Sequence, residues 1–93
     1  MDDNILLGAL PLQKYVSVLI KERVGLVINV THEFDSSQNN YSKHGIKEIQ
    51  LNVIDFCAPS LSQIEFAVDQ INKFIKNNPK SCVYVHCKVN IFI

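Results

Sequence analysis

The chain has 93 residues, enough for one domain with a small hydrophobic core. Hydrophobic residues make up 47% of the sequence and charged residues 19%, which is typical of a globular protein and excludes a disordered chain. Lys and Arg together number 9, as do Asp and Glu, so the formal net charge is zero and bulk charge predicts no nucleic-acid partner.

The N-terminus and the cysteines bear on the cellular compartment. The chain begins Met1-Asp-Asp-Asn4, which is neither a secretory leader nor the Arg-rich, acid-poor start of a transit peptide. Three cysteines are an odd number, so we expect thiols rather than a disulfide framework. No apolar run approaches the roughly 18 residues of a membrane span. These features predict a cytoplasmic protein without a transmembrane segment.

The first third of the chain predicts a strand, a helix and a second strand. The apolar run 5–10 is closed by Pro11, which suits a strand that turns into a helix. Apolar residues then recur at helical spacing from Leu12, which predicts one buried helical face before Gly25 ends the helix. The predicted face consists of Tyr15, Val16, Leu19 and Ile20. The run 26–30 is apolar except at Asn29 and predicts a central strand.

The middle of the chain predicts a loop followed by an edge strand. Residues 31–45 are mostly polar, and we expect an exposed loop there. In 46–54, apolar and polar residues alternate, which is typical of a strand with one wetter face near the edge of a sheet. The segment 55–59 ends with proline and breaks this strand.

A long amphipathic helix and a short apolar strand complete the predicted elements. Ser60 and Gln63 have the spacing of a capping box, and we expect a helix over 60–77. The predicted apolar face consists of Ile64, Ala67, Val68, Ile71, Phe74 and Ile75. The apolar segment 82–86 then predicts a strand that runs directly into Cys87.

The order strand, helix, strand, loop, strand, helix, strand predicts the fold class. Such alternation indicates an α/β fold, with a mostly parallel sheet and helices on its faces, within a single domain over 1–93. Ligands of these folds bind beyond the carboxyl ends of the strands. Two of these ends lead to reactive side chains, Asp55 and Cys87.

The chemistry expected at these two ends is phosphoryl transfer. A loop that joins a strand to a helix can lower the pKa of a cysteine thiol, and its backbone N–H groups can bind phosphate. A phosphatase also needs an arginine that grips two phosphoryl oxygens and a carboxylic acid that protonates the leaving oxygen. Asp55, at the end of a different strand from Cys87, can be that acid.

The cluster Cys82, His86 and Cys87 can also be considered as a zinc site. Alternate strand residues point to opposite faces, so Cys82, Tyr84 and His86 share one face while Cys87 faces the other. The sequence has no second ligand pair at zinc-finger spacing. It also lacks a dinucleotide-binding or Walker-type glycine pattern, so we expect neither a metal nor a cofactor.

Three stretches of the sequence resemble a known family in order and spacing. They are Leu6-Leu-Gly-Ala-Leu-Pro11, Asp55 ahead of Ala58-Pro-Ser60, and Val83-Tyr-Val-His-Cys-Lys88. Together they resemble the dual-specificity cysteine phosphatases of the protein-tyrosine phosphatase superfamily. The resemblance is strongest to the mitochondrial phosphatases that act on phosphatidylglycerophosphate and to their plant relatives.

The resemblance implies a set of site residues and a substrate class. Cys87 would be the nucleophile, Asp55 the general acid and His86 a supporting residue. The phosphate-binding backbone would come from Lys88, Val89 and Asn90. The substrate would be a phosphate monoester, either a phospholipid headgroup or a phosphoprotein. The same resemblance implies a mitochondrial location.

The sequence departs from this family inside the phosphate-binding loop. The family loop reads His-Cys-x-x-Gly-x-x-Arg and continues into a helix, whereas the Gly position here is Asn90 and the Arg position is Ile93. We therefore expect the N-terminal part of a cysteine-phosphatase fold without its C-terminal helices, with weak or no activity. Without those helices, one apolar face of strand 82–86 is expected to be exposed. The alternatives are a non-catalytic pseudophosphatase fragment that binds phosphate or a partner, and a terminus that comes from a misread exon.

Overall fold

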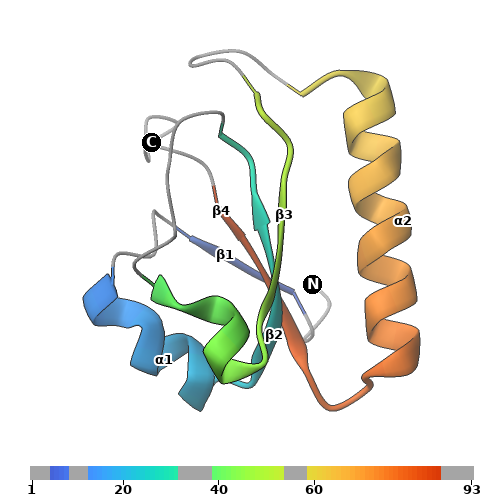
Figure 1. The fold of residues 1–93 in the computed structure, drawn as a ribbon. Helices are drawn as coiled ribbons and strands as arrows, with labels where there is room; N and C mark the ends of the chain where they lie inside the picture. The colour runs from blue at the N-terminus through green and yellow to red at the C-terminus, as the bar shows by residue number, and fades with distance from the viewer. Residues whose placement is uncertain (1–4, 9–12, 32–38, 54–58, 87–93) are drawn as a thin grey trace.

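Four parallel strands form one sheet in the structure of the protein, a computed structural model that describes residues 5–8, 13–31, 39–53 and 59–86 (Figure 1). The elements are β1 (Ile5–Gly8), η1 (Gln13–Tyr15), α1 (Val16–Lys21), β2 (Val24–Asn29), η3 (Tyr41–His44), β3 (Lys47–Gln50), α2 (Leu61–Asn77) and β4 (Cys82–His86). The strand order is β1-β4-β2-β3, and each neighbouring pair is parallel. The predicted parallel α/β architecture is therefore confirmed.

The two central strands carry the most deeply buried side chains. Val27 in β2 and Val83 in β4 have no exposed surface. Side chains of a central strand are covered from both faces of the sheet, which explains the nearly continuous apolar runs of β2 and β4. Within the predicted strand 46–54, β3 spans only Lys47–Gln50, and it lies at the edge of the sheet as predicted.

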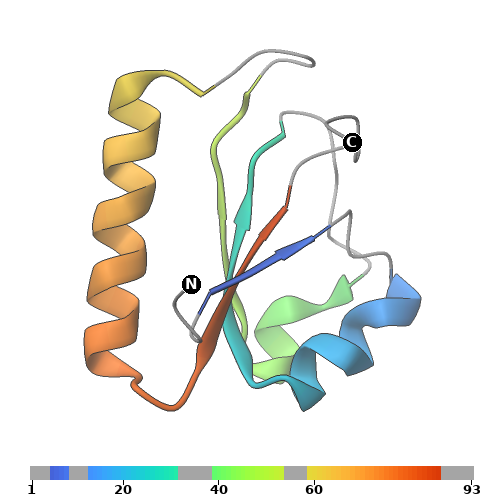
Figure 2. The same cartoon turned by 180° about the vertical axis from the view of Figure 1, so that it is seen from behind.

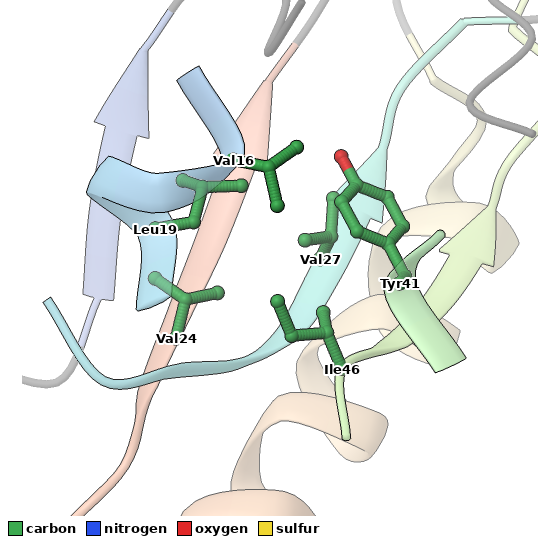
Figure 3. Packing of buried hydrophobic residues seen from close by; sticks show 6 residues of the cluster. All are labelled: Val16, Leu19, Val24, Val27, Tyr41 and Ile46. Carbon is green, nitrogen blue, oxygen red and sulfur yellow. The ribbon is translucent and has the colours of Figure 1, made fainter. Parts of the chain in front are cut away.

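Helices cover both faces of the sheet and create two separate cores (Figures 1 and 2). The α1-side core consists of Val16, Leu19, Val24, Val27, Tyr41 and Ile46 (Figure 3). The α2-side core consists of Leu26, Ile28, Leu51, Val53, Ala67 and Val83. Because β2 contributes to both cores, this strand joins the two layers of packing.

The helix α2 begins as the sequence predicts. The Ser60 side chain accepts a hydrogen bond from the Gln63 backbone N–H at 3.1 Å, and the Gln63 side chain accepts one from the Ser60 backbone N–H at 2.8 Å. The predicted apolar face is only partly correct. Ala67 is buried and Ile71, Phe74 and Ile75 pack against the α2-side core, whereas Ile64 and Val68 are about half exposed.

The helix α1 is shorter than predicted, and its buried face is narrower. A 3-10 turn precedes it, and only Val16 and Leu19 are buried, while Tyr15 and Ile20 are exposed. A six-residue helix has room for one buried side chain per turn against the sheet, so the prediction of a buried face of four residues was wrong.

The end of α1 depends on an arginine rather than on the predicted glycine. Arg23 has a φ of 62° and makes the left-handed turn that leads into β2. Gly25 lies inside β2 instead, where an added Cβ would lie 2.7 Å from the ring of Phe74. The glycine therefore permits close packing of α2 on the sheet.

Replacing Arg23 with glycine is expected to raise the free energy of unfolding by about 0.5–1 kcal/mol, because glycine adopts the left-handed region without the cost of a Cβ. A domain of this size should then melt a few degrees higher, at about 4–8 °C per kcal/mol. Thermal unfolding followed by circular dichroism measures the shift. Arg23→Ala is the control, since it removes the same side chain but keeps the Cβ, and an equal gain in both variants would contradict the explanation.

Two further predictions differ from the structure. The segment 31–45 is not wholly exposed, since Thr31, Asn39 and Tyr41 are buried. Strand 82–86 does not expose an apolar face either, because Val83 and Val85 pack in the α2-side core and Cys82 and Tyr84 pack against the α1-side core. Among the described residues, the most exposed large apolar side chains are instead Leu7 of β1 and Leu61, the first residue of α2.

Candidate active site

The last residues of all four strands lie in one row across the sheet. His86 of β4 is in register with Gly8 of β1 and with Asn29 of β2, and Asn29 is in register with Gln50 of β3. We call these four residues the terminal row. They mark the carboxyl edge of the sheet, where ligands of parallel α/β proteins bind.

The terminal row faces the α1 side of the sheet. Leu6 and Tyr84, two residues before Gly8 and His86, both pack against the α1-side core, and strand side chains two apart share a face. Gly8 makes room here, because an added Cβ would overlap the Tyr84 hydroxyl. The predicted common face of Cys82, Tyr84 and His86 is confirmed by Cys82 and Tyr84, which pack against the same core.

His86 is fixed both through its backbone and by its surroundings. Its carbonyl oxygen accepts a hydrogen bond from the Val30 backbone N–H at 2.8 Å. The imidazole is only 2% exposed, and its centroid lies 5.9 Å from that of the Tyr84 ring, with the planes tilted by 32°. The residue directly before Cys87 is therefore part of the packed sheet.

A buried polar network surrounds Asn29, which is 1% exposed. The Thr31 hydroxyl donates to Asn29 Oδ1 at 2.7 Å, and Asn29 Nδ2 donates to Glu48 Oε2 at 3.3 Å. Gln50 Nε2 donates to the Thr31 carbonyl at 3.1 Å. This network was not predicted from the sequence, although a single polar residue inside the apolar run of a central strand is a signal for one.

A second polar group lies farther down the α1 side. Tyr41 is buried in the α1-side core, and its hydroxyl oxygen accepts a hydrogen bond from Asn39 Nδ2 at 3.1 Å. Burial raises the pKa of the Tyr41 phenol, and the charges of Glu48 and Tyr84 raise it further, whereas the Asn39 hydrogen bond opposes the shift. Tyr41 therefore links η3 to the face on which Glu48 and Tyr84 lie.

The stability of the fold is expected to fall as the pH rises above about 10, the ordinary pKa of tyrosine. The folded state binds the Tyr41 proton more tightly than the unfolded state does, so ionisation first stabilises the unfolded chain. The loss continues until Tyr41 ionises in the folded state as well. Urea titrations between pH 8 and 11 measure it, and Tyr41→Phe should show a shallower decline. Tyr15→Phe, at an exposed position, should follow the native chain.

Most of the site residues predicted from the sequence lie outside the described residues. These are Asp55, Cys87, Lys88, Val89 and Asn90. The described chain reaches Val53, two residues before Asp55, and His86, directly before Cys87. Val53 is buried in the α2-side core, and His86 ends β4. Both of these positions are at the carboxyl edge of the sheet. The roles of the five residues remain predictions.

Other features of the described chain lie away from this edge or concern other kinds of site. A groove of about 340 Å³ lies between α2 and β3, but its lining includes Lys47 at the start of β3 and Asn77 at the end of α2, so it is at the opposite end of the sheet. Among the described residues, no group of three His, Cys, Asp or Glu side chains is placed to hold a metal ion. Within the same residues, no helix has the length and apolarity needed to cross a membrane.

Comparison with known proteins identifies the family of this chain. The family model for a phosphatase described as "polymorphic toxin system, DSP-PTPase phosphatase" matches residues 7–91. The human phosphatidylglycerophosphatase and protein-tyrosine phosphatase 1 is 30% identical over 95 residues, which cover 95% of this chain and 46% of the human protein. The mouse protein of the same name is also 30% identical and is covered to 48%. The chain thus spans about half the length of the curated relatives it matches.

Solved structures agree with the family match. The crystal structure of PTPMT1 superposes with a TM-score of 0.77 at 31% identity, covering 95% of this chain and 59% of that one. The structure of Tk-PTP in the active form superposes with a TM-score of 0.80 at 16% identity, covering 94% of this chain and 58% of that one, which shows the fold alone. The family resemblance of the three sequence stretches is therefore confirmed: the chain belongs to the DSP-PTPase phosphatases.

Proposed function

We propose that the chain is a cysteine-dependent phosphatase in which Cys87 is the nucleophile and Asp55 the general acid. The observation that supports this most is the position of His86, which is buried and fixed at the carboxyl end of a central strand, directly before Cys87. A strand held in this way delivers the next residue to the edge of the sheet where parallel α/β proteins bind ligands. The family match over residues 7–91 supports the same assignment.

The proposed reaction proceeds in two steps. The Cys87 thiolate attacks phosphorus, the bond to the leaving oxygen breaks, and Asp55 gives that oxygen its proton, which leaves a phosphocysteine. The Asp55 carboxylate then takes a proton from water, which attacks phosphorus and releases phosphate and the thiolate. The backbone N–H groups of Lys88, Val89 and Asn90 would hold the phosphoryl oxygens.

The proposed substrate is a phosphate monoester on a phospholipid headgroup or on tyrosine. Both substrate classes appear in the name of the relatives, phosphatidylglycerophosphatase and protein-tyrosine phosphatase 1. Parallel assays with phosphatidylglycerophosphate in vesicles and with a phosphotyrosine peptide separate the two. We propose low activity on either, because Asn90 and Ile93 replace the glycine and arginine of the family loop.

The same two replacements favour a second candidate function, a non-catalytic module that binds phosphate or a partner. Without an arginine, the loop lacks the planar donor pair that grips two phosphoryl oxygens. The backbone N–H groups would still bind an anion weakly. A binding module would show saturable phosphate binding and no turnover.

Hydrolysis of p-nitrophenyl phosphate by the native chain and by Cys87→Ser tests the proposal. We expect slow product release by the native chain and none above the uncatalysed rate by Cys87→Ser. Equal release by the two proteins would contradict a cysteine nucleophile. Phosphate binding without turnover, measured by calorimetry on the native chain, would favour the second candidate.

A further inference from the structure

Asn29 is held in one orientation by the side chains on either side of it. A side-chain amide has an acceptor oxygen and a donor nitrogen, so its neighbours decide which way round it lies. The Thr31 hydroxyl donates to Oδ1 at 2.7 Å, and the Glu48 carboxylate accepts from Nδ2 at 3.3 Å. Turning the amide over would place Oδ1 against the Glu48 carboxylate, which only accepts, so that hydrogen bond would be lost; the Thr31 hydroxyl can donate or accept and holds the amide in place either way.

The fixed amide lies beside His86. Asn29 and His86 are register partners on adjacent parallel strands, which are about 4.8 Å apart. Both belong to the terminal row on the α1 side, and they are 1% and 2% exposed, so the two side chains are buried at neighbouring positions of this row. Val30, directly after β2, also fixes the backbone of β4, because its N–H donates to the His86 carbonyl at 2.8 Å.

The charged and titratable groups near this pair come from three elements. Tyr84 of β4 lies 5.9 Å from His86 between ring centroids. Glu48 of β3 bonds Asn29, and Tyr41 of η3 is close enough to Glu48 and Tyr84 for their charges to affect it. None of these groups belongs to the nucleophile, acid or phosphate-binding set of the proposed function.

We propose that Asn29 is a positioning residue: its amide, oriented by Thr31 and Glu48, fixes the imidazole of His86 and, through the end of β4, the backbone that carries Cys87. The effect on His86 stands on the packing alone. The effect on Cys87 rests on the proposed function. Glu48 acts here through Asn29 and has no contact with substrate in this proposal.

A donor–acceptor exchange tests the orientation. In Asn29→Asp, the Thr31 hydroxyl still has an acceptor, but two carboxylates face each other where the Asn29–Glu48 hydrogen bond was. In the double variant Asn29→Asp with Glu48→Gln, the glutamine amide donates to the new aspartate, so the hydrogen bond returns in reverse and the net charge equals that of the native chain. Thr31→Val removes the other hydrogen bond to Asn29 without adding a charge.

Two measurements report on the two steps of the proposal. Long-range 15N–1H spectra of labelled histidine give the tautomer of His86, with His32→Gln and His44→Gln used for assignment. Mass spectrometry after timed iodoacetamide treatment gives the alkylation rate of Cys87 separately from Cys57 and Cys82. We expect Asn29→Asp and Thr31→Val to shift the His86 signals and to slow Cys87 alkylation about fivefold, the scale of coupling between hydrogen-bonded neighbours. The double variant should restore the native His86 signals and return the Cys87 alkylation rate to within about twofold of native.

The control is Asn39→Ala, which removes another buried amide on the same side of the sheet, the one bonded to Tyr41. It should lower stability and leave the His86 signals unchanged; an equal shift would mean general loosening and would overturn the proposal. Unchanged His86 signals in folded Thr31→Val, or no recovery in the double variant, would also overturn it. If Asn29→Asp does not fold, Thr31→Val against the native chain decides the question. The proposed function is tested separately, by the hydrolysis assay with Cys87→Ser.

Discussion

Replacing Asn90 with glycine and Ile93 with arginine is expected to raise the rate of aryl-phosphate hydrolysis by about two to four decades. An arginine that donates two charge-assisted hydrogen bonds to phosphate contributes about 3–6 kcal/mol, at about 1.4 kcal/mol for each factor of ten. Glycine at position 90 would let the backbone approach the phosphoryl oxygens closely. Initial rates of the native chain, both single variants and the double variant measure the gain and its division between the two positions.

Two controls make this result specific. Ile93→Lys beside Asn90→Gly restores the positive charge without the planar fork of arginine, so it should recover only part of the rate. Cys87→Ser in the repaired loop should return the rate to the uncatalysed level. A repaired chain no faster than the native one would show that residues 90 and 93 do not limit turnover, and would favour the binding module.

Replacing Val83 with aspartate is expected to unfold the protein at 25 °C. Val83 has no exposed surface and lies in the α2-side core beside Leu26, its register partner in β2. A carboxylate there would be buried without a counter-ion, at a cost of several kcal/mol that compares with the roughly 5–15 kcal/mol stability of a whole domain. Far-ultraviolet circular dichroism and urea titration measure the loss.

The matched control for Val83 is Leu7→Asp, on the same face of the neighbouring strand. Leu6 packs on the α1 side, so Leu7 faces the α2 side as Val83 does, but it is 66% exposed. Its carboxylate would remain in water, so we expect a change within about 0.5 kcal/mol. A loss as large as that of Val83→Asp would mean that the α2 face beside β1 is covered in solution.

The sequence predicts the sheet better than the helices that cover it. Apolar runs and strict alternation depend on which faces of a strand are covered, so the central position of β2 and the edge position of β3 could be predicted. The capping box at Ser60 could also be predicted, because it depends only on residues that are close together in the sequence. Which side chains of α1 are buried depends on how this short helix packs on the sheet, and the spacing of apolar residues does not show that. Tyr15 and Ile20 were therefore assigned to its buried face wrongly.

The candidate site shows a similar division. Cys87 and Asp55 are predicted by their place after strands and by the family motif, and His86 by its place beside Cys87. The hydrogen-bond partners of Asn29 are Thr31 and Glu48. The sequence predicts an exposed loop around Thr31 and a solvent-facing position for Glu48 on an edge strand. Thr31 is two residues from Asn29, but only the pairing of β2 with β3 brings Glu48 to it, and strand register cannot be read from composition.

The order of strands in the sheet has a consequence for how the protein folds. β4 lies between β1 and β2, so the first strand of the chain has no neighbour until the last described strand is in place. Ile5 pairs with Val83 and Val24 with Cys82, so most of the chain must be brought into a closed loop before these contacts form. Folding dominated by such distant parallel pairings is slow, on the scale of about milliseconds to seconds. We therefore expect docking of β4 to be the late, cooperative step, so that the strand leading to Cys87 becomes ordered only when the whole sheet does.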